Sequence, residues 1–278
     1  MCRNLVLAAT ALSLALASPA LAKDKDKAPA PATAAKPAAA APPAPPRKAT
    51  AQERLEAERL DPLARAAFWA REVDVDARDL DAGARLAASL RAIGRNEDAA
   101  GAAQKVLVID PANREALLEL ARAYLAGGQG FFAIEPLNKL QTQDARDWRV
   151  PSLLGVAYEQ VSRDSDAETA WRQALTLSPD NPAILSNLAM HYAAKGDSAQ
   201  AESLLRKAIT RPGATLQMRQ NLALVLGLQG RFAEAEQLTR QDLPPELAEA
   251  NMAYLHAAAG GGDARSWKAL QGAQAATN

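Results

Sequence analysis

The sequence repeats one arrangement of small and large residues every 34 positions. A Leu followed by a small residue or by Gly opens the arrangement five times, at Leu86, Leu120, Leu154, Leu188 and Leu222. Eight residues after each Leu stands a Gly, replaced in the third unit by Ser162, and thirteen residues after it stands an Ala. Five units in unbroken register are typical of a protein built from stacked structural repeats.

Each unit is too short to bury its own apolar face, so it must form two helices that stack on the next pair. In the third unit, Leu154 and Trp171 are large residues that fill the space between helices. Gly155 and Ala167 are small, which predicts that two helix backbones approach each other there. The Gly or Ser162 position predicts the turn after the first helix. We therefore predict an all-α, right-handed α-solenoid of stacked antiparallel helix pairs, in keeping with an aromatic content of only 4%.

The period also sets the boundaries of a helical domain over 51–278. Counted from six residues before each Leu, the units begin at about Leu80, Arg114, Trp148, Pro182 and Leu216. The ends are irregular, as the outer faces of a stacked array must be. We expect a lone capping helix over about 52–73, and an irregular sixth unit with a C-terminal helix over 246–278 and a short last helix around 266–271. Pro136 lies inside the second helix of the second unit and predicts a late start or a kink there.

Residues 1–22 have the pattern of a signal peptide. Arg3 precedes a mostly apolar run, and Ala20-Leu21-Ala22 is a small-residue cleavage site, so we expect cleavage after Ala22. The run is shorter than the roughly 20 residues that a membrane-spanning helix needs, which disfavours the alternative of an uncleaved anchor. Cys2 lies ahead of the apolar run, where it cannot be a lipid site at the cleavage point. In a double-membraned bacterium the destination would be the periplasm, either free or associated with the outer membrane.

Residues 23–50 form a linker rich in Pro, Ala and Lys that we expect to be disordered and partly polyproline II-like. Pro and Ala occupy 18 of its 28 positions. It contains six cationic residues and two aspartates, which gives a net charge of +4. Residues 51–278 carry a net charge of −5. The linker could be a tether that touches anionic lipid or peptidoglycan, or an ordinary solvated spacer.

The repeats resemble the tetratricopeptide repeat, whose 34-residue pattern contains Leu-Gly-x2-Tyr followed by Ala, a large residue and Pro. Longer stretches, including "RAYLAGGQGFFAIEPL", "DWRVPSLLGVAYEQ" and "RQNLALVLGLQGRFAEAE", resemble the TadD-like component of the tight-adherence (Flp) pilus assembly system over residues 61–256. This resemblance implies a role in pilus assembly at the outer membrane, through contacts with the secretin and associated proteins. Relatives of this kind are often lipoproteins, and this chain lacks the lipid-site cysteine.

The sequence shows no pattern of a catalytic, metal or cofactor site, and we expect no enzyme and no cofactor. The only histidines, His191 and His256, lie far apart, whereas a metal site needs three or four converging ligands. "AGGGD" at 259–263 lacks the Lys-Ser/Thr of a phosphate loop. Equal numbers of cationic and acidic residues, 32 each, give no basic stripe for nucleic acid.

Protein binding is the function that the pattern favours, because the first helices of stacked pairs line the concave side of the array. Helical periodicity places these partner-binding candidates on that side: Arg122, Leu125, Arg149, Val156, Glu159, Asn187, Met190, Gln220, Asn221, Leu224 and Asn251. The Asn residues either hydrogen-bond the main chain of an extended ligand, as in peptide-binding members of the repeat family, or merely suit this helix position.

We therefore predict a scaffold or assembly factor for tight-adherence pilus biogenesis that holds partner segments in a concave groove. The expected partners are other pilus-assembly or secretin-complex proteins, with no nucleic acid and no small-molecule substrate. Membrane contact would be indirect or through the basic linker. The alternative is a general periplasmic scaffold for another envelope process, such as cytochrome maturation or polysaccharide export.

Overall fold

The computed structural model describes residues 47–260, except the side chains of Tyr254 and of residues 257–260. The chain divides into two compact units, Met1–Pro45 and Pro46–Asn278, and the described residues all belong to the second. The predicted signal peptide, most of the predicted linker and the predicted last helix around 266–271 lie outside the described residues.

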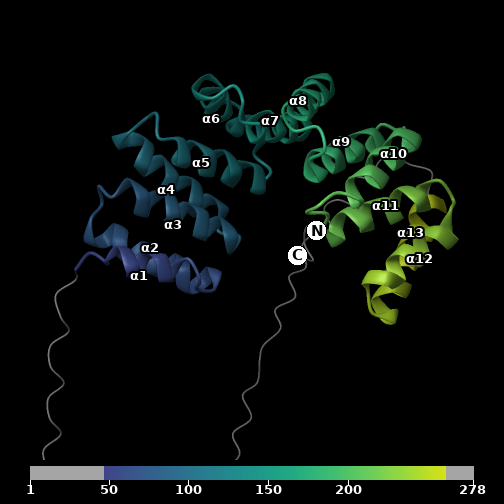
Figure 1. The fold of residues 1–278 in the computed structure, drawn as a ribbon, viewed down its shortest axis with the longest axis horizontal. Coiled ribbons are helices and arrows are strands. Elements are labelled where there is room, and N and C mark those ends of the chain that lie inside the picture. Colours follow the sequence, from purple (N-terminus) through teal and green to yellow (C-terminus); the bar gives the residue numbers. More distant parts are fainter. Residues whose placement is uncertain (1–46, 261–278) are drawn as a thin grey trace, which may run out of the picture. The chain divides into compact units, whose positions relative to one another are not determined.

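Residues 47–260 form thirteen α-helices and no β-strand, as the repeat pattern predicts (Figure 1). The helices are α1 (Ala51–Ala57), α2 (Pro62–Val75), α3 (Leu80–Ala92), α4 (Asn96–Ile109), α5 (Arg114–Ala126), α6 (Gly130–Gln143), α7 (Arg149–Gln160), α8 (Asp164–Leu177), α9 (Pro182–Ala194), α10 (Ser198–Ile209), α11 (Leu216–Leu228), α12 (Phe232–Asp242) and α13 (Pro245–Gly260). Four of the five predicted repeat starts are helix starts, and α7 begins one residue late because Trp148 is its N-cap.

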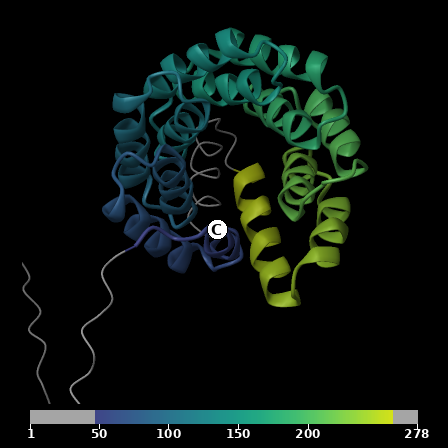
Figure 2. The same ribbon diagram turned by 60° about the vertical axis from the view of Figure 1, so that its left-hand side comes forward.

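The helices pack as pairs in a continuous row. From α3 to α13, each helix contacts the next along the chain, so that every pair is joined to its neighbours. The first helices α3, α5, α7, α9 and α11 also contact one another in sequence, whereas the second helices make fewer direct contacts. The row therefore curves toward the first helices, which lie on its inner side (Figure 2).

Each helix pair turns through a residue of positive φ at the position that the sequence pattern marks. These residues are Gly94 (77°), Gly128 (70°), Ser162 (58°), Gly196 (84°) and Gly230 (75°). In each turn the following N–H donates to the carbonyl five residues earlier, for example Arg163 to Tyr158 at 2.9 Å. This closing bond satisfies a carbonyl that the helix end leaves free. The predicted turn position is confirmed in all five units.

The repeated Ala position of each unit is fully buried, with 0% exposure at Ala99, Ala133, Ala167, Ala201 and Ala235. Gly155 is small for a different reason from the predicted close approach of two helix backbones. A Cβ at Gly155 would lie 2.7 Å from Cδ1 of Trp171, so Gly155 makes room for an indole and not for a second backbone. The indole Nε1–H donates to the Ser152 carbonyl at 3.1 Å, which holds the ring over the glycine.

The prediction of one capping helix was wrong, and so was the late start, one of the two outcomes predicted for Pro136. The capping segment is not one helix but two, α1 and α2, because the Asp61 side chain accepts from the backbone N–H of Leu63 and Ala64 and Pro62 opens α2. Pro136 does not delay α6, which begins at Gly130 in register with the other second helices. Pro136 is the seventh residue of α6 and is accommodated inside the helix.

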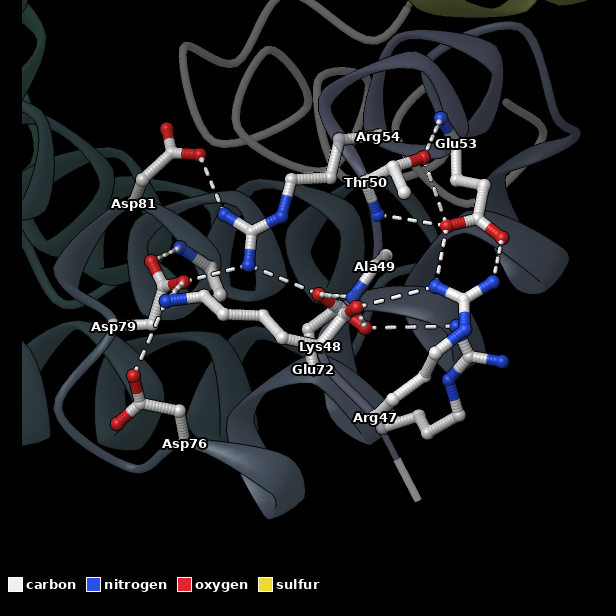
Figure 3. A network of polar contacts seen from close by, with 12 residues as sticks. Arg47, Lys48, Ala49, Thr50, Glu53, Arg54, Glu72, Asp76, Asp79 and Asp81 are labelled. Carbon is white, nitrogen blue, oxygen red and sulfur yellow. Dashed lines mark hydrogen bonds and ion pairs between the residues drawn. The ribbon is translucent and has the colours of Figure 1, made fainter. Parts of the chain in front are cut away.

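The structured unit begins before residue 51, because residues 47–50 of the predicted linker are held by ion pairs and hydrogen bonds (Figure 3). Arg47 forms two bonds to the Glu53 carboxylate, at 2.9 and 2.7 Å. Both carboxylate oxygens of the fully buried Glu72 accept from the Ala49 N–H, at 3.1 and 3.0 Å. Nη2 of Arg54 lies 2.9 Å from Oε2 of Glu72, so the buried carboxylate has a cationic partner.

The same network lowers the pKa of two acids. The Arg47 guanidinium, together with bonds from Thr50, lowers the pKa of Glu53 to about 2. Burial by itself raises the pKa of Asp79, but hydrogen bonds from Arg54, Lys48 and the Ala82 N–H outweigh it and hold the pKa well below its usual range. Both carboxylates therefore stay charged at neutral pH and keep residues 47–50 attached to the first helices.

Candidate protein-interaction surface

A set of half-buried apolar and amide side chains lies on α7, α9 and α11, the first helices of three neighbouring pairs. Val156, Asn187, Met190, Gln217 and Gln220 belong to this set, which we call the inner surface. Four of these five residues are predicted groove residues, and Gln217 lies one turn before Gln220 on α11. Half-buried side chains of this kind have exposed atoms that can contact a ligand without the side chain leaving its place in the fold.

Three predicted groove residues belong to the core instead. Leu125 and Leu224 are 8% and 3% exposed. Asn221, 8% exposed, donates from Nδ2 to the Ser186 hydroxyl at 3.3 Å and accepts from Gln217 at 3.0 Å. It therefore links α9 to α11 within the protein. Leu224 is buried because α13 packs against α11 and brings Met252 and Leu255 into the same cluster.

The charged candidates mostly tie neighbouring first helices together. Arg122 pairs with Glu119 at 2.7 Å, and Glu119 also accepts from Arg91 of α3 at 2.9 Å. Glu159 of α7 bonds Nδ1 of His191 on α9 at 2.6 Å. These side chains are half-buried and already engaged, so a ligand would have to compete with existing bonds.

The two remaining candidates are Arg149, the first residue of α7, and Asn251, within α13. Arg149 is exposed and pairs with Asp147 at 2.8 Å. Burial by itself raises the pKa of Asp147, but bonds from Arg149 outweigh it and lower the pKa. Asp147 also pairs with Arg114, which connects the starts of α5 and α7. Asn251 is half-buried on α13.

Neither histidine lies in a metal site. His191 is 2% exposed and packs against Trp171 with ring centroids 5.5 Å apart. His256 is exposed and stacks on Phe232 at 4.0 Å. Within residues 47–260, no group of three or more His, Cys, Asp or Glu is placed to hold a metal ion. None of the helices in this part of the chain combines the length and apolarity needed to cross a membrane.

A second surface, which the sequence reasoning missed, lies between α4 and α6 with α5 as its floor. We call it the aromatic groove, and its apolar lining is Leu107, Leu117, Leu120, Tyr124, Phe131, Phe132, Ile134 and Pro136. Phe131 and Phe132 are 71% and 57% exposed. The signal was present in the sequence as two consecutive Phe residues at a helix start, where the other second helices have at most one aromatic residue.

Comparison with known proteins identifies the repeat. Residues 184–215 and 215–243, which fall on α9–α10 and α11–α12, each match a family described as the tetratricopeptide repeat. The structure resembles TTC0263, a thermophilic tetratricopeptide-repeat protein of Thermus thermophilus, with 24% identity and a TM-score of 0.57 over 63% of this chain and 98% of that one. The fold is a tetratricopeptide-repeat solenoid.

Other solved structures are similar at lower identity, one of them a tetratricopeptide-repeat protein. One from Parabacteroides merdae ATCC 43184 is 13% identical, with a TM-score of 0.60 over 72% of this chain and 78% of that chain. MamA of Desulfovibrio magneticus RS-1 is 21% identical, with a TM-score of 0.51 over 57% of this chain and 89% of that one. No curated protein matches the sequence significantly. These likenesses establish the tetratricopeptide-repeat fold alone.

Proposed function

We propose that this protein is an interaction scaffold that binds a segment of another protein on its inner surface. The observation that carries the proposal is the composition of that surface. Met190 and Val156 offer apolar contacts, and Asn187 and Gln220 offer amide hydrogen bonds, all half-buried on neighbouring first helices. A curved row of stacked pairs holds these side chains at fixed spacing, so an uncharged extended or helical segment can meet several of them at once.

The process that we propose is assembly of a tight-adherence pilus in the periplasm. Support comes from the sequence resemblance over residues 61–256 and from the predicted signal peptide with cleavage after Ala22. The partners would be proteins of the secretin complex. A scaffold for cytochrome maturation or polysaccharide export is the alternative process, and it would use the same inner surface.

Site-specific crosslinking in cells tests both levels of the proposal. A photoreactive residue at Val156 or Met190 should capture a partner, whereas one at Leu177, 36% exposed at the end of α8, should not. Capture of a secretin-complex protein supports the pilus, and capture of a cytochrome-maturation or export protein supports the alternative. If Leu177 captures the same protein as Val156, the inner surface is not the binding site.

A single substitution separates binding from folding. Asn187→Leu should weaken partner capture without loss of helix content, because Asn187 is half-buried. Gln237→Leu, on the exposed side of α12, is the matched control and should leave capture unchanged. Asn221→Leu is unsuitable for this purpose, since it removes the bond to Ser186 and leaves that buried hydroxyl without its partner.

A further inference from the structure

The aromatic groove is a separate surface from the inner surface and presents a row of rings to solvent. Phe132 lies 5.6 Å from Tyr124 and 5.6 Å from Phe131, centroid to centroid. Two adjacent Phe side chains that are more than half exposed contribute nothing to the core. Exposed apolar clusters in a groove commonly mark a binding site.

The same groove recurs two repeats later, between α8 and α10, but there its tyrosine is covered by a polar network. Tyr192 takes the place of Tyr124, and its hydroxyl donates to Glu168 at 2.8 Å and accepts from Arg172 at 2.8 Å. Gln200 stands where the first groove has Phe132. The polar network covers Tyr192 to 7% exposure, so the open aromatic lining belongs to the first groove and not to the repeat in general.

The chemistry of the open groove favours an uncharged occupant. The charged residues that line it are engaged, Glu135 with Lys139 at 2.9 Å and Arg163 with Asp166 at 2.7 Å. Proline has no N–H, so Pro136 cannot supply the helical hydrogen bond that the Phe132 carbonyl would otherwise accept. Gln104, whose amide donates to the Tyr124 hydroxyl at 2.8 Å, and Asn138 add polar groups at the rim.

Stacked aromatic rings beside hydrogen-bonding groups are the features by which proteins bind proline-rich segments in the polyproline II conformation. This chain contains such a segment, Pro42-Pro43-Ala44-Pro45-Pro46, which is uncharged and directly precedes the anchored Arg47. Five residues span at most about 18 Å. The chain is held at Arg47 beside α1, whereas Phe131 and Phe132 lie at the start of α6 with the α3–α4 pair between them, which favours a groove on another molecule. We propose that the aromatic groove binds the proline-rich segment 42–46 of a second copy of this chain.

Sedimentation of the mature chain, residues 23–278, over a range of concentrations tests the proposal. We expect self-association that both Phe131→Ala/Phe132→Ala and the Pro→Ala variant of residues 42, 43, 45 and 46 weaken by about tenfold or more. Val108→Ser, which removes an 84% exposed side chain of α4 outside the groove lining, is the control and should not change it. Circular dichroism should show the same helix content in every variant.

Mixing the two variants gives a complementation test. The Phe variant keeps its proline-rich segment and the Pro variant keeps its groove. Mixed together, they should form a dimer of one copy of each variant and no larger assembly. A labelled peptide of residues 36–47 should bind the Pro variant and not the Phe variant. A chain that stays monomeric at every concentration, or self-association that survives both sets of substitutions, overturns the proposal. If the peptide binds but the protein stays monomeric, the groove holds the segment 42–46 of its own chain, and the proposal of a second copy is overturned.

Discussion

The third and fourth repeats follow the same backbone path with different side chains. In the third, Gly155 and Trp171 occupy the positions that Ala189 and Leu205 occupy in the fourth. Trp171 is 2% exposed, and Ala189 and Leu205 are both 0% exposed. The larger ring is thus matched by the smaller partner, and the two pairs fill the same space between helices. The comparison teaches that the third repeat accommodates a larger residue on its second helix through a smaller residue on its first helix.

Of the changes that test this comparison, Trp171→Ala should have the largest effect on the free energy of unfolding. The substitution leaves a cavity over Gly155, removes the bond to the Ser152 carbonyl and removes the ring that packs on His191. We expect a loss of about 3–5 kcal/mol in the free energy of unfolding, measured by urea denaturation. Leu205→Ala, the matched change in the fourth repeat, should cost about 2–5 kcal/mol. A loss below about 1 kcal/mol for Trp171→Ala would mean that the ring is not packed as described.

Gly155→Ala tests the volume match directly. The new Cβ would meet the indole of Trp171, so we expect a loss of about 1–3 kcal/mol from overpacking. The double variant Gly155→Ala/Trp171→Leu gives the third repeat the pair found in the fourth. It should be more stable than the sum of the two single changes predicts, with a coupling of at least about 1 kcal/mol. Simple additivity in this double-mutant cycle would show that the two positions do not share one volume.

A smaller effect should come from the polar network that joins the third repeat to the fourth. Hydrogen bonds from Tyr192 and from Arg172 lower the pKa of Glu168. Because this pKa is depressed in the folded state, the stabilisation is present above the ordinary value of 4.5 and is lost as the pH falls below it. We expect Glu168→Gln to cost about 1 kcal/mol at pH 7.

The pH dependence of the difference in unfolding free energy between the parent and Glu168→Gln tests whether the charge of Glu168 is the cause. The free energies of unfolding of the parent and of Glu168→Gln should converge as the pH falls through the lowered pKa of Glu168, because below that pKa its side chain is uncharged like that of Gln. Glu97→Gln, on the exposed start of α4, is a control that should show no such convergence. A difference that stays constant across this range would show that the charge of Glu168 contributes nothing.

The sequence alone predicted those features that depend on neighbouring residues within one unit. The turns at Gly94, Gly128 and Ser162 follow from backbone conformation, which a single position decides. The burial of Asn221 and Leu224 could not be predicted in the same way. The burial of Leu224 depends on α13, whose register is irregular and whose packing on α11 no period describes. Asn221 instead hydrogen-bonds Ser186 of α9 and Gln217 of α11.

The cause of the small Gly155 and the exposed rings of the aromatic groove could not be predicted from the pattern either. The first depends on the direction of the Trp171 side chain, which spacing does not give. The second depends on the absence, beside Tyr124, of the carboxylate that Glu168 supplies beside Tyr192. Both are differences between units, whereas a repeat pattern reports what the units share.

The turns provide the last and smallest test of the comparison. Ser162 has a φ of 58°, the left-handed conformation that Gly196 supplies without strain in the fourth repeat. Ser162→Gly should therefore stabilise the protein by about 0.5–1 kcal/mol, even though Gly increases the entropy of the unfolded chain. Gly196→Ser should destabilise it by about 1 kcal/mol through the backbone alone, because a Cβ there meets nothing within 4 Å. Opposite shifts in the urea midpoint would show that both turns impose the same backbone strain. If Ser162→Gly destabilises instead, the serine stabilises its turn in a way that outweighs the strain of its backbone.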